Sequence, residues 1–111
     1  MKKTIVINSE FMGSGDEDLG RQLMGSFLRK LSLEESKPEK IIFYNSGVKL
    51  LAIGSPVLDG ISLLTEAGIE IMACGTCVHF YQLEDRIERG LIGDMQRIIS
   101  TLMNSDKVIT I

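Results

Sequence analysis

The sequence lacks any long hydrophobic run. No stretch of its 111 residues approaches the roughly 18 uncharged apolar residues that a membrane-spanning helix requires. At the N-terminus, Lys2 and Lys3 precede an apolar run (Thr4–Ile7) that is far too short for a signal peptide. We therefore expect no membrane association and a cytoplasmic protein, in which Cys74 and Cys77 are reduced thiols unless they carry chemistry.

The sequence also lacks a basic cluster. It has 12 Lys and Arg against 15 Asp and Glu, and no run of basic residues exceeds two. Nucleic-acid binding and basic membrane helices both need such a cluster, so neither partner is expected. Intrinsic disorder is excluded by an apolar content of 44% with a net charge of only −3. The length fits one domain, and we find no repeat or linker.

Four short segments have the composition of buried strands. Each is rich in β-branched residues and apolar on both faces: Thr4–Asn8, Lys40–Tyr44, Ile69–Ala73 and Lys107–Ile111. A strand that is apolar on both faces must be covered on both sides, so these segments predict a parallel sheet between two helical layers. A short further strand near Leu91–Ile92 is left open.

The segments between these strands have helical periodicity. The first helix is expected to begin with Ser14 as its N-cap, with Glu17 completing a capping box, and to run to about Leu31. Its apolar stripe is expected to face the core: Leu19, Leu23, Phe27 and Leu31, joined by Met24 and Leu28. Further helices are expected from Ser55-Pro56 to Gly68, from Val78 to about Glu88, and after an Asp94 cap with Met95, Ile98, Ile99 and Leu102 facing inward.

The alternation of strands and helices predicts an α/β fold, a flavodoxin-like three-layer sandwich with a mainly parallel sheet of strand order 2-1-3-4. Ligands and chemistry in such folds lie at the carboxyl ends of the strands. Three loops are expected to converge there: Asn8–Gly15, Asn45–Gly47 and Cys74–Cys77.

The C-x-x-C sequence Cys74-Gly75-Thr76-Cys77 is the most informative motif, because it follows a strand and precedes a helix that Thr76 could cap. Backbone N–H groups and the helix dipole favour a thiolate there, so we expect thiol pKa values below the free value of about 8.5. Gly75 allows a tight turn that leaves the sulfurs accessible. The alternative is a pair of small buried hydrophobic residues.

The remaining polar candidates give weaker signals. His79 is the only histidine and could serve as a proton shuttle, although a lone helical histidine is more often a surface residue. With Cys74 and Cys77 it supplies three ligands at most, so no metal is expected. The turns containing Gly13-Ser14 and Asn45-Ser46-Gly47 are either ordinary tight turns or walls of a cysteine pocket. No phosphate-binding glycine motif is present, and no cofactor is expected.

Several separated motifs together resemble one known family. These are Met12–Leu19 (MGSGDEDL), Asn45–Leu50 (NSGVKL), Gly54-Ser55, and Ala73–Cys77 followed by Phe80-Tyr81. They look like the DsrE-like domain of the YedF family of sulfurtransferase-like proteins linked to selenium metabolism. The resemblance covers nearly all of residues 1–111 as a single DsrE-like domain. It implies a flavodoxin-like fold, a persulfide on Cys74, and exchange with a TusA-like sulfur-relay module.

Three functions remain open at this stage. The first is a persulfide or selenium carrier or transferase that uses Cys74, with Cys77 as resolving thiol. The second is a dithiol–disulfide oxidoreductase that uses both cysteines, and the third is a non-enzymatic binding subunit. A homo-oligomer, a trimer or a hexamer, is expected from the family and from six methionines, Phe80, Tyr81 and a mean hydropathy of +0.16.

Overall fold

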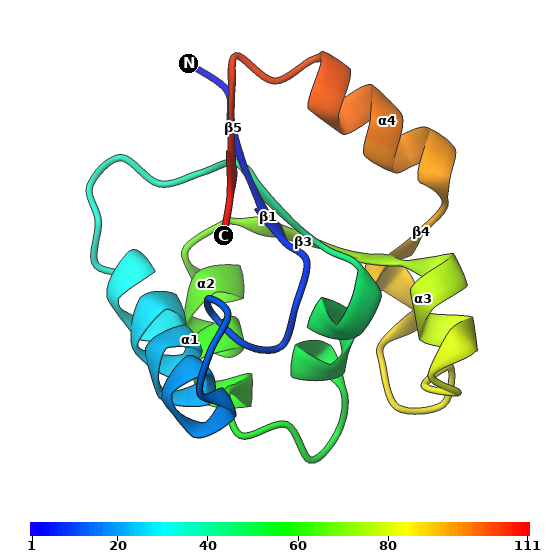
Figure 1. The fold of residues 1–111 in the computed structure, drawn as a ribbon. Coiled ribbons are helices and arrows are strands. Elements are labelled where there is room, and N and C mark those ends of the chain that lie inside the picture. The colour runs from blue at the N-terminus through cyan, green and yellow to red at the C-terminus, as the bar shows by residue number, and fades with distance from the viewer.

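The computed structural model describes residues 1–111 as a five-stranded sheet with helices on both faces (Figure 1). The strands are β1 (Lys3–Ile7), β2 (Lys40–Phe43), β3 (Glu70–Cys74), β4 (Ile92–Gly93) and β5 (Lys107–Thr110). The helices are α1 (Glu17–Leu31), α2 (Leu58–Glu66), α3 (Gly75–Phe80) and α4 (Met95–Met103). Two 3-10 helices complete the chain, η1 (Asn45–Leu51) and η2 (Arg89–Leu91). No helix combines the length and the apolar character needed to cross a membrane.

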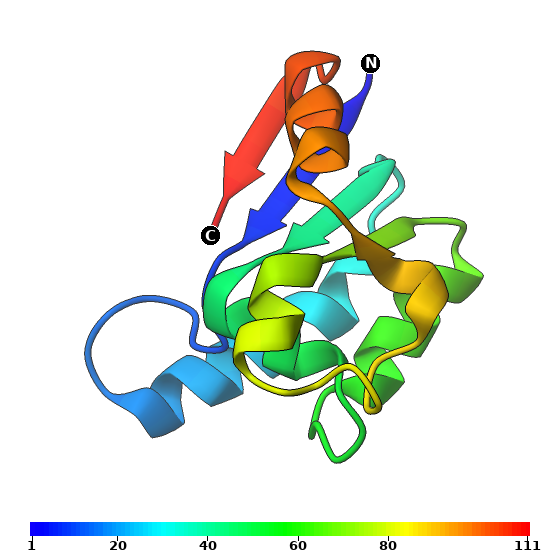
Figure 2. The ribbon, with the colours of Figure 1, turned by 90° about the vertical axis from the view of Figure 1, so that its right-hand side faces the viewer.

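The sheet has the order β4-β3-β2-β1-β5, and every neighbouring pair is parallel. This confirms the expected α/β class, but the expected order 2-1-3-4 is wrong. β2 lies between β1 and β3, whereas the expected order placed the first strand between the second and the third. The chain steps in one direction from β1 to β4, and then α4 carries it back across the opposite face to β5 (Figure 2). Right-handed crossovers require this change of face when the direction of stepping reverses.

Two apolar clusters fill the space on either side of the sheet. The larger lies under α1 and α2 and includes alternate strand residues such as Ile5, Ile41 and Ile71. The smaller lies under α4 and consists of Ile42, Met72, Cys74 and Ile98. Since consecutive strand residues point to opposite faces, both clusters come from the same strands. The strands must therefore be apolar on both faces, as their sequences predicted.

Three of the expected helices begin at other residues. The second was expected to begin at Ser55-Pro56, but α2 begins at Leu58, after a turn through Pro56 and Val57. The N-cap of α1 is Asp16, whose side chain accepts a hydrogen bond from the Leu19 N–H at 2.8 Å, because the chain is still turning through Ser14 between two glycines with positive φ. The third helix begins at Gly75 and ends at Phe80, because Gln82 adopts a φ of +58° and turns the chain away. Asp94 caps α4 as expected, accepting from the Arg97 N–H at 2.9 Å.

Some apolar residues are less buried than their periodicity predicts. Helix α1 turns its glycine-containing side inward, burying Gly20, Met24, Gly25 and Leu28, because the small residues allow close approach of neighbouring chain segments. Leu19 and Leu23 consequently remain exposed. Met95 and Ile99 of α4 are also exposed, and every residue of β5 is exposed although its sequence is that of a buried strand.

Candidate active site around two cysteines

Cys74 lies at the carboxyl end of β3, at the edge where the parallel strands end together. It is the N-cap residue of α3, and its side chain packs into the small cluster with Ile42, Met72 and Ile98. Only 1% of Cys74 is exposed. The structure therefore places this thiol inside the protein, and not in an open cleft as its position at a strand end predicted.

Cys77 is the more accessible of the two thiols. It lies in the first turn of α3, is partly exposed, and packs against the cluster that contains Cys74. Both cysteines are free. The main-chain N–H of Asn45 donates a hydrogen bond to the Cys77 sulfur, with 3.0 Å between nitrogen and sulfur. The loop after β2 therefore supplies a fixed donor to the thiol that solvent can reach.

The Asn45 turn is built to place this donor. Asn45 has a φ of +51°, a left-handed conformation that asparagine adopts more readily than most other non-glycine residues. Its side-chain oxygen accepts a hydrogen bond from the Tyr81 hydroxyl at 3.2 Å. Gly47 packs so closely on β1 that a Cβ there would lie 2.4 Å from the Ile7 carbonyl oxygen. These contacts hold the turn against both α3 and β1.

A network of polar side chains links this turn to the loop after β1 and to the end of α3. The Ser46 hydroxyl accepts a hydrogen bond from the Glu10 N–H at 3.1 Å, and the Glu10 carboxylate pairs with Lys49 at 3.3 Å. The Lys49 ammonium also lies 4.6 Å from the centre of the Tyr81 ring, a cation–π contact. Sequence reasoning missed Glu10, Lys49 and Tyr81. The detectable signal was the spacing of Tyr81, one helical turn after Cys77.

The acidity of Cys77 differs from the expectation. Burial raises the pKa of the Cys77 thiol, the Asn45 N–H lowers it, and the neighbouring Cys74 side chain raises it again, so that the pKa lies above its ordinary value. The expected lowering is wrong for this thiol because desolvation is the largest cause. The helix that was expected to supply the positive dipole is only six residues long. Cys77 is therefore held mainly as the protonated thiol at neutral pH.

The other expected pocket residues lie in different surroundings. Gly75 is at the start of α3, where a Cβ would lie 3.3 Å from the Ile92 side chain, and Thr76 is exposed and does not cap the helix. The His79 imidazole points to solvent and pairs with Glu84 at 2.6 Å. The pKa of the Glu84 carboxyl is lowered. The main cause is a hydrogen bond from the Glu84 backbone N–H, and the second is the hydrogen bond with the His79 side chain. No three His, Cys, Asp or Glu side chains lie close enough together to hold a metal ion.

Gly13 and Ser14 do not form a wall of the cysteine site. Both are exposed and belong to the loop that projects from the carboxyl end of β1 (Figure 2, dark blue). Gly13 has a φ of +87° with no atom within 4 Å of a built Cβ. Asn45, Ser46 and Gly47 are thus the expected pocket residues that the structure brings to Cys77, together with Gly75 and Thr76 on its own helix.

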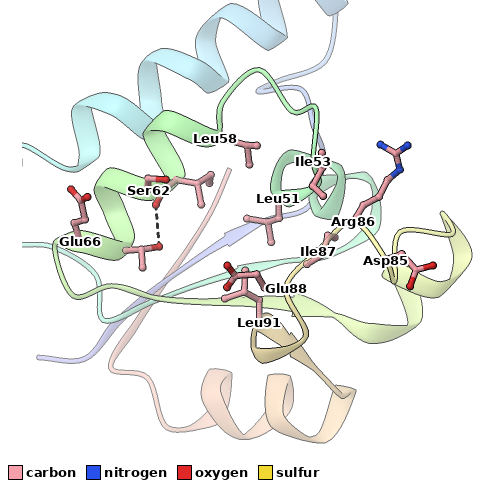
Figure 3. Close-up of a pocket in the computed structure, with 12 residues that line it drawn as sticks. Leu51, Ile53, Leu58, Ser62, Glu66, Asp85, Arg86, Ile87, Glu88 and Leu91 are labelled. Atoms are coloured by element: carbon pink, nitrogen blue, oxygen red, sulfur yellow. Dashed lines mark hydrogen bonds between the residues drawn. The ribbon is translucent and has the colours of Figure 1, made fainter.

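A separate hollow of about 650 Å³ lies between α2 and the segment that leads to η2 (Figure 3). Its floor is apolar and includes Leu51, Ile61 and Ile87. Glu66 and Glu88 stand at its rim. Neither cysteine lines this hollow, so the hollow is separate from the cysteine site.

The sequence matches no known family model and no curated protein. Solved structures are similar in fold. The YchN protein of E. coli superposes with a TM-score of 0.74 at 17% identity, over 99% of this chain and 98% of that one. MTH1491 of Methanobacterium thermoautotrophicum gives 0.71 at 20% identity over 99% and 98%. BT1422 of Bacteroides thetaiotaomicron gives 0.68 at 20% identity over 99% and 95%. The chain therefore has a YchN-like fold, which is a DsrE-like fold. The last two are described as proteins of unknown function.

Proposed function

We propose that this protein is a sulfur carrier or transferase that holds a persulfide on its cysteine pair. The observation that carries the proposal is the Cys77 thiol, partly exposed at the carboxyl edge of the sheet, with the Asn45 N–H donating to its sulfur. A second thiol, Cys74, lies buried behind it. The DsrE-like fold supports a sulfur-related role, and the motif resemblance points to the same chemistry.

Cys77 is the thiol that we assign to sulfur uptake. The resemblance favours Cys74, but a donor cannot reach a side chain that is 1% exposed unless the chain opens. After Cys77 loses its proton to solvent, its thiolate attacks the outer sulfur of a donor persulfide. The donor S–S bond breaks, an S–S bond forms on Cys77, and the donor leaves as a thiolate. The exchange is balanced and needs no oxidant or reductant.

Delivery reverses the same step. An acceptor thiolate attacks the outer sulfur, and Cys77 leaves as a thiolate that the Asn45 N–H stabilises by hydrogen bonding. Without an acceptor, Cys74 can attack the inner sulfur, which forms a Cys74–Cys77 disulfide and releases hydrosulfide. A TusA-like sulfur-relay protein is the class of donor or acceptor that the resemblance implies. A selenium-containing donor would load the same thiol by the same attack.

Intact-mass measurement tests this proposal directly. The protein is incubated with a low-molecular-weight persulfide and its mass is followed over time. We expect the wild type and Cys74→Ser to gain the mass of one sulfur atom, and Cys77→Ser to gain none. Cys74→Ser should retain its sulfur longer, because the resolving thiol is gone. If loading is lost in Cys74→Ser and kept in Cys77→Ser, Cys74 takes up the sulfur and Cys77 is the resolving thiol.

The two other functions give different masses. A dithiol–disulfide oxidoreductase would lose two hydrogens on incubation with a disulfide substrate, in a reaction that requires both cysteines, and would not retain an added sulfur. Equal loading of the wild type and the double serine variant would show that neither cysteine carries sulfur. That result would overturn the proposal and favour a binding subunit.

A further inference from the structure

The hollow beside α2 is not part of the cysteine site. It lies between α2 and the segment that leads to η2, and its volume is about 650 Å³ (Figure 3). Sites for small molecules typically have volumes of about 300–1,000 Å³. Leu51, Ile61 and Ile87 form its floor and belong to the large apolar cluster, so packing of the core holds the floor in place.

The wall opposite α2 is also held in place. The Ile53 N–H donates a hydrogen bond to the Arg86 carbonyl oxygen at 2.9 Å, and the Leu91 N–H donates to the Glu88 carbonyl oxygen at 3.0 Å. Ile87, between these two bonds, is buried. The hollow is therefore formed before any ligand enters, which lowers the entropic cost of binding there.

The charged groups at this hollow are acidic. Glu66 and Glu88 stand at its rim, and the Glu88 carboxylate is turned toward the hollow (Figure 3). Neither carboxylate forms an ion pair within the chain. Arg86 is the only basic residue that lines the hollow, and its side chain points away from the floor, as does that of Asp85 (Figure 3). No basic side chain of the protein therefore neutralises the two carboxylates.

The end of α2 adds to this negative charge. Glu66 is the last residue of the helix, and the last turn contains no basic residue. A helix carries partial negative charge at its C-terminus, where a basic side chain is favourable and an acidic one is unfavourable. Residues that break such a local rule are expected at functional sites. A bound cation would relieve the unfavourable charge at this position.

We propose that this hollow binds a small organic amine. The apolar body of the ligand lies on Leu51, Ile61 and Ile87, where removal of its surface from water favours binding. Its ammonium group faces Glu66 and Glu88, whose carboxylates select a cation over an anion of similar shape. The hollow has room for an apolar body larger than the stem of a lysine side chain, which favours a free small molecule over a protein partner. The site is independent of sulfur transfer, because neither cysteine lines it.

Titration of the protein with matched probes, followed by the amide signals in NMR spectra, tests the site. Phenylbutylamine, phenylbutanol and phenylbutyrate share one apolar group and differ in charge, whereas butylamine reproduces a lysine side chain. We expect phenylbutylamine to bind with a dissociation constant of the order of millimolar, because the ligand is small, and to shift signals of α2 and of residues 85–91. Phenylbutanol, phenylbutyrate and butylamine should each bind more weakly, phenylbutyrate by at least about tenfold.

Charge reversal at the rim tests the role of the carboxylates. Glu66→Lys combined with Glu88→Lys should reverse the preference, so that phenylbutyrate binds better than phenylbutylamine. The variant should fold, because Glu66→Lys places a favourable charge at the C-terminus of α2. Asp59→Asn is the matched control, since Asp59 is an exposed acidic residue of α2 that does not line the hollow. It should leave the affinities for both probes unchanged.

A filled hollow tests the location. Ser62 is an exposed residue of α2 that lines the hollow, so Ser62→Phe should occupy the space without disturbing the core. We expect it to abolish phenylbutylamine binding while the circular dichroism spectrum stays native. The proposal would be overturned if phenylbutylamine caused no shifts, or if the wild type bound phenylbutyrate or butylamine equally well. It would also be overturned if a folded Ser62→Phe or charge-reversed variant bound phenylbutylamine as the wild type does.

Discussion

Gly47 lies in the turn that packs against β1 and that also supplies the Asn45 N–H to Cys77. A Cβ at this position would lie 2.4 Å from the Ile7 carbonyl oxygen, whereas ordinary contact begins at 3.4 Å. The carbonyl cannot move aside cheaply, because it accepts the Tyr44 N–H at 3.1 Å at the start of the same turn. In Gly47→Ala the turn itself must therefore shift by about 1 Å away from β1.

The shift should have two measurable effects. Overpacking of this kind costs about 1–3 kcal/mol of the free energy of unfolding, which for a chain of this size lowers the melting temperature by about 4–12 °C. The shift also moves the Asn45 N–H away from the Cys77 sulfur. Since that N–H lowers the Cys77 pKa, its loss should raise the pKa further. Cys77 should then react more slowly with iodoacetamide at a fixed neutral pH.

The assay compares Gly47→Ala with Gly90→Ala, in which the new methyl group meets no atom within 4 Å. Urea denaturation gives the stability, and peptide mapping after alkylation gives the rate at Cys77. We expect Gly90→Ala to stay within about 0.5 kcal/mol of the wild type, with an unchanged rate. If Gly47→Ala were as stable and as reactive as Gly90→Ala, the close packing of this turn on β1 would be refuted.

Three further predictions concern single side chains. The Tyr81 hydroxyl anchors the turn whose Asn45 N–H donates to Cys77. Tyr81→Phe should therefore lower the free energy of unfolding by about 0.5–1.5 kcal/mol and shift the pH profile of Cys77 alkylation to higher pH. An unchanged profile would contradict this. Cys74→Ala should shift the same profile to lower pH, because Cys74 raises the Cys77 pKa. Asp16→Ala should lower the free energy of unfolding by about 1 kcal/mol through the loss of the α1 cap, whereas Ser14→Ala should be nearly neutral by the same urea titration.

The class of fold followed from local pattern, because each strand must be apolar on both faces to lie between two helical layers. The strand order did not follow. Strands such as Lys40–Phe43 and Glu70–Cys74 are equally apolar, and nothing local specifies which neighbour each will have. The order depends on the face that each crossover covers, and therefore on how α1 and α2 pack together. Gly60 of α2 packs against Leu28 and Arg29 of α1, and α1 buries its own Gly20 and Gly25, so Leu19 and Leu23 stay outside.

The cysteine motif was visible in the sequence because its spacing and its place after a strand are local properties. The turn Asn45-Ser46-Gly47 was also visible as a second loop at the same edge. The contacts that hold this turn in place were not visible, because Glu10, Asn45 and Tyr81 come from three segments that only the folded sheet brings together. The sign of the pKa change was mistaken for the same reason, since desolvation depends on what packs around the thiol.

The sequence by itself determined the α/β class, the approximate extents of four strands, and the pair of thiols at the end of the third. Those features depend on composition and spacing within short segments, which the chain carries before it folds. The tertiary structure decided which thiol is buried, which N–H faces the other, and which apolar residues remain exposed. These are distances between segments far apart in the chain, and packing between helices and sheet fixes them.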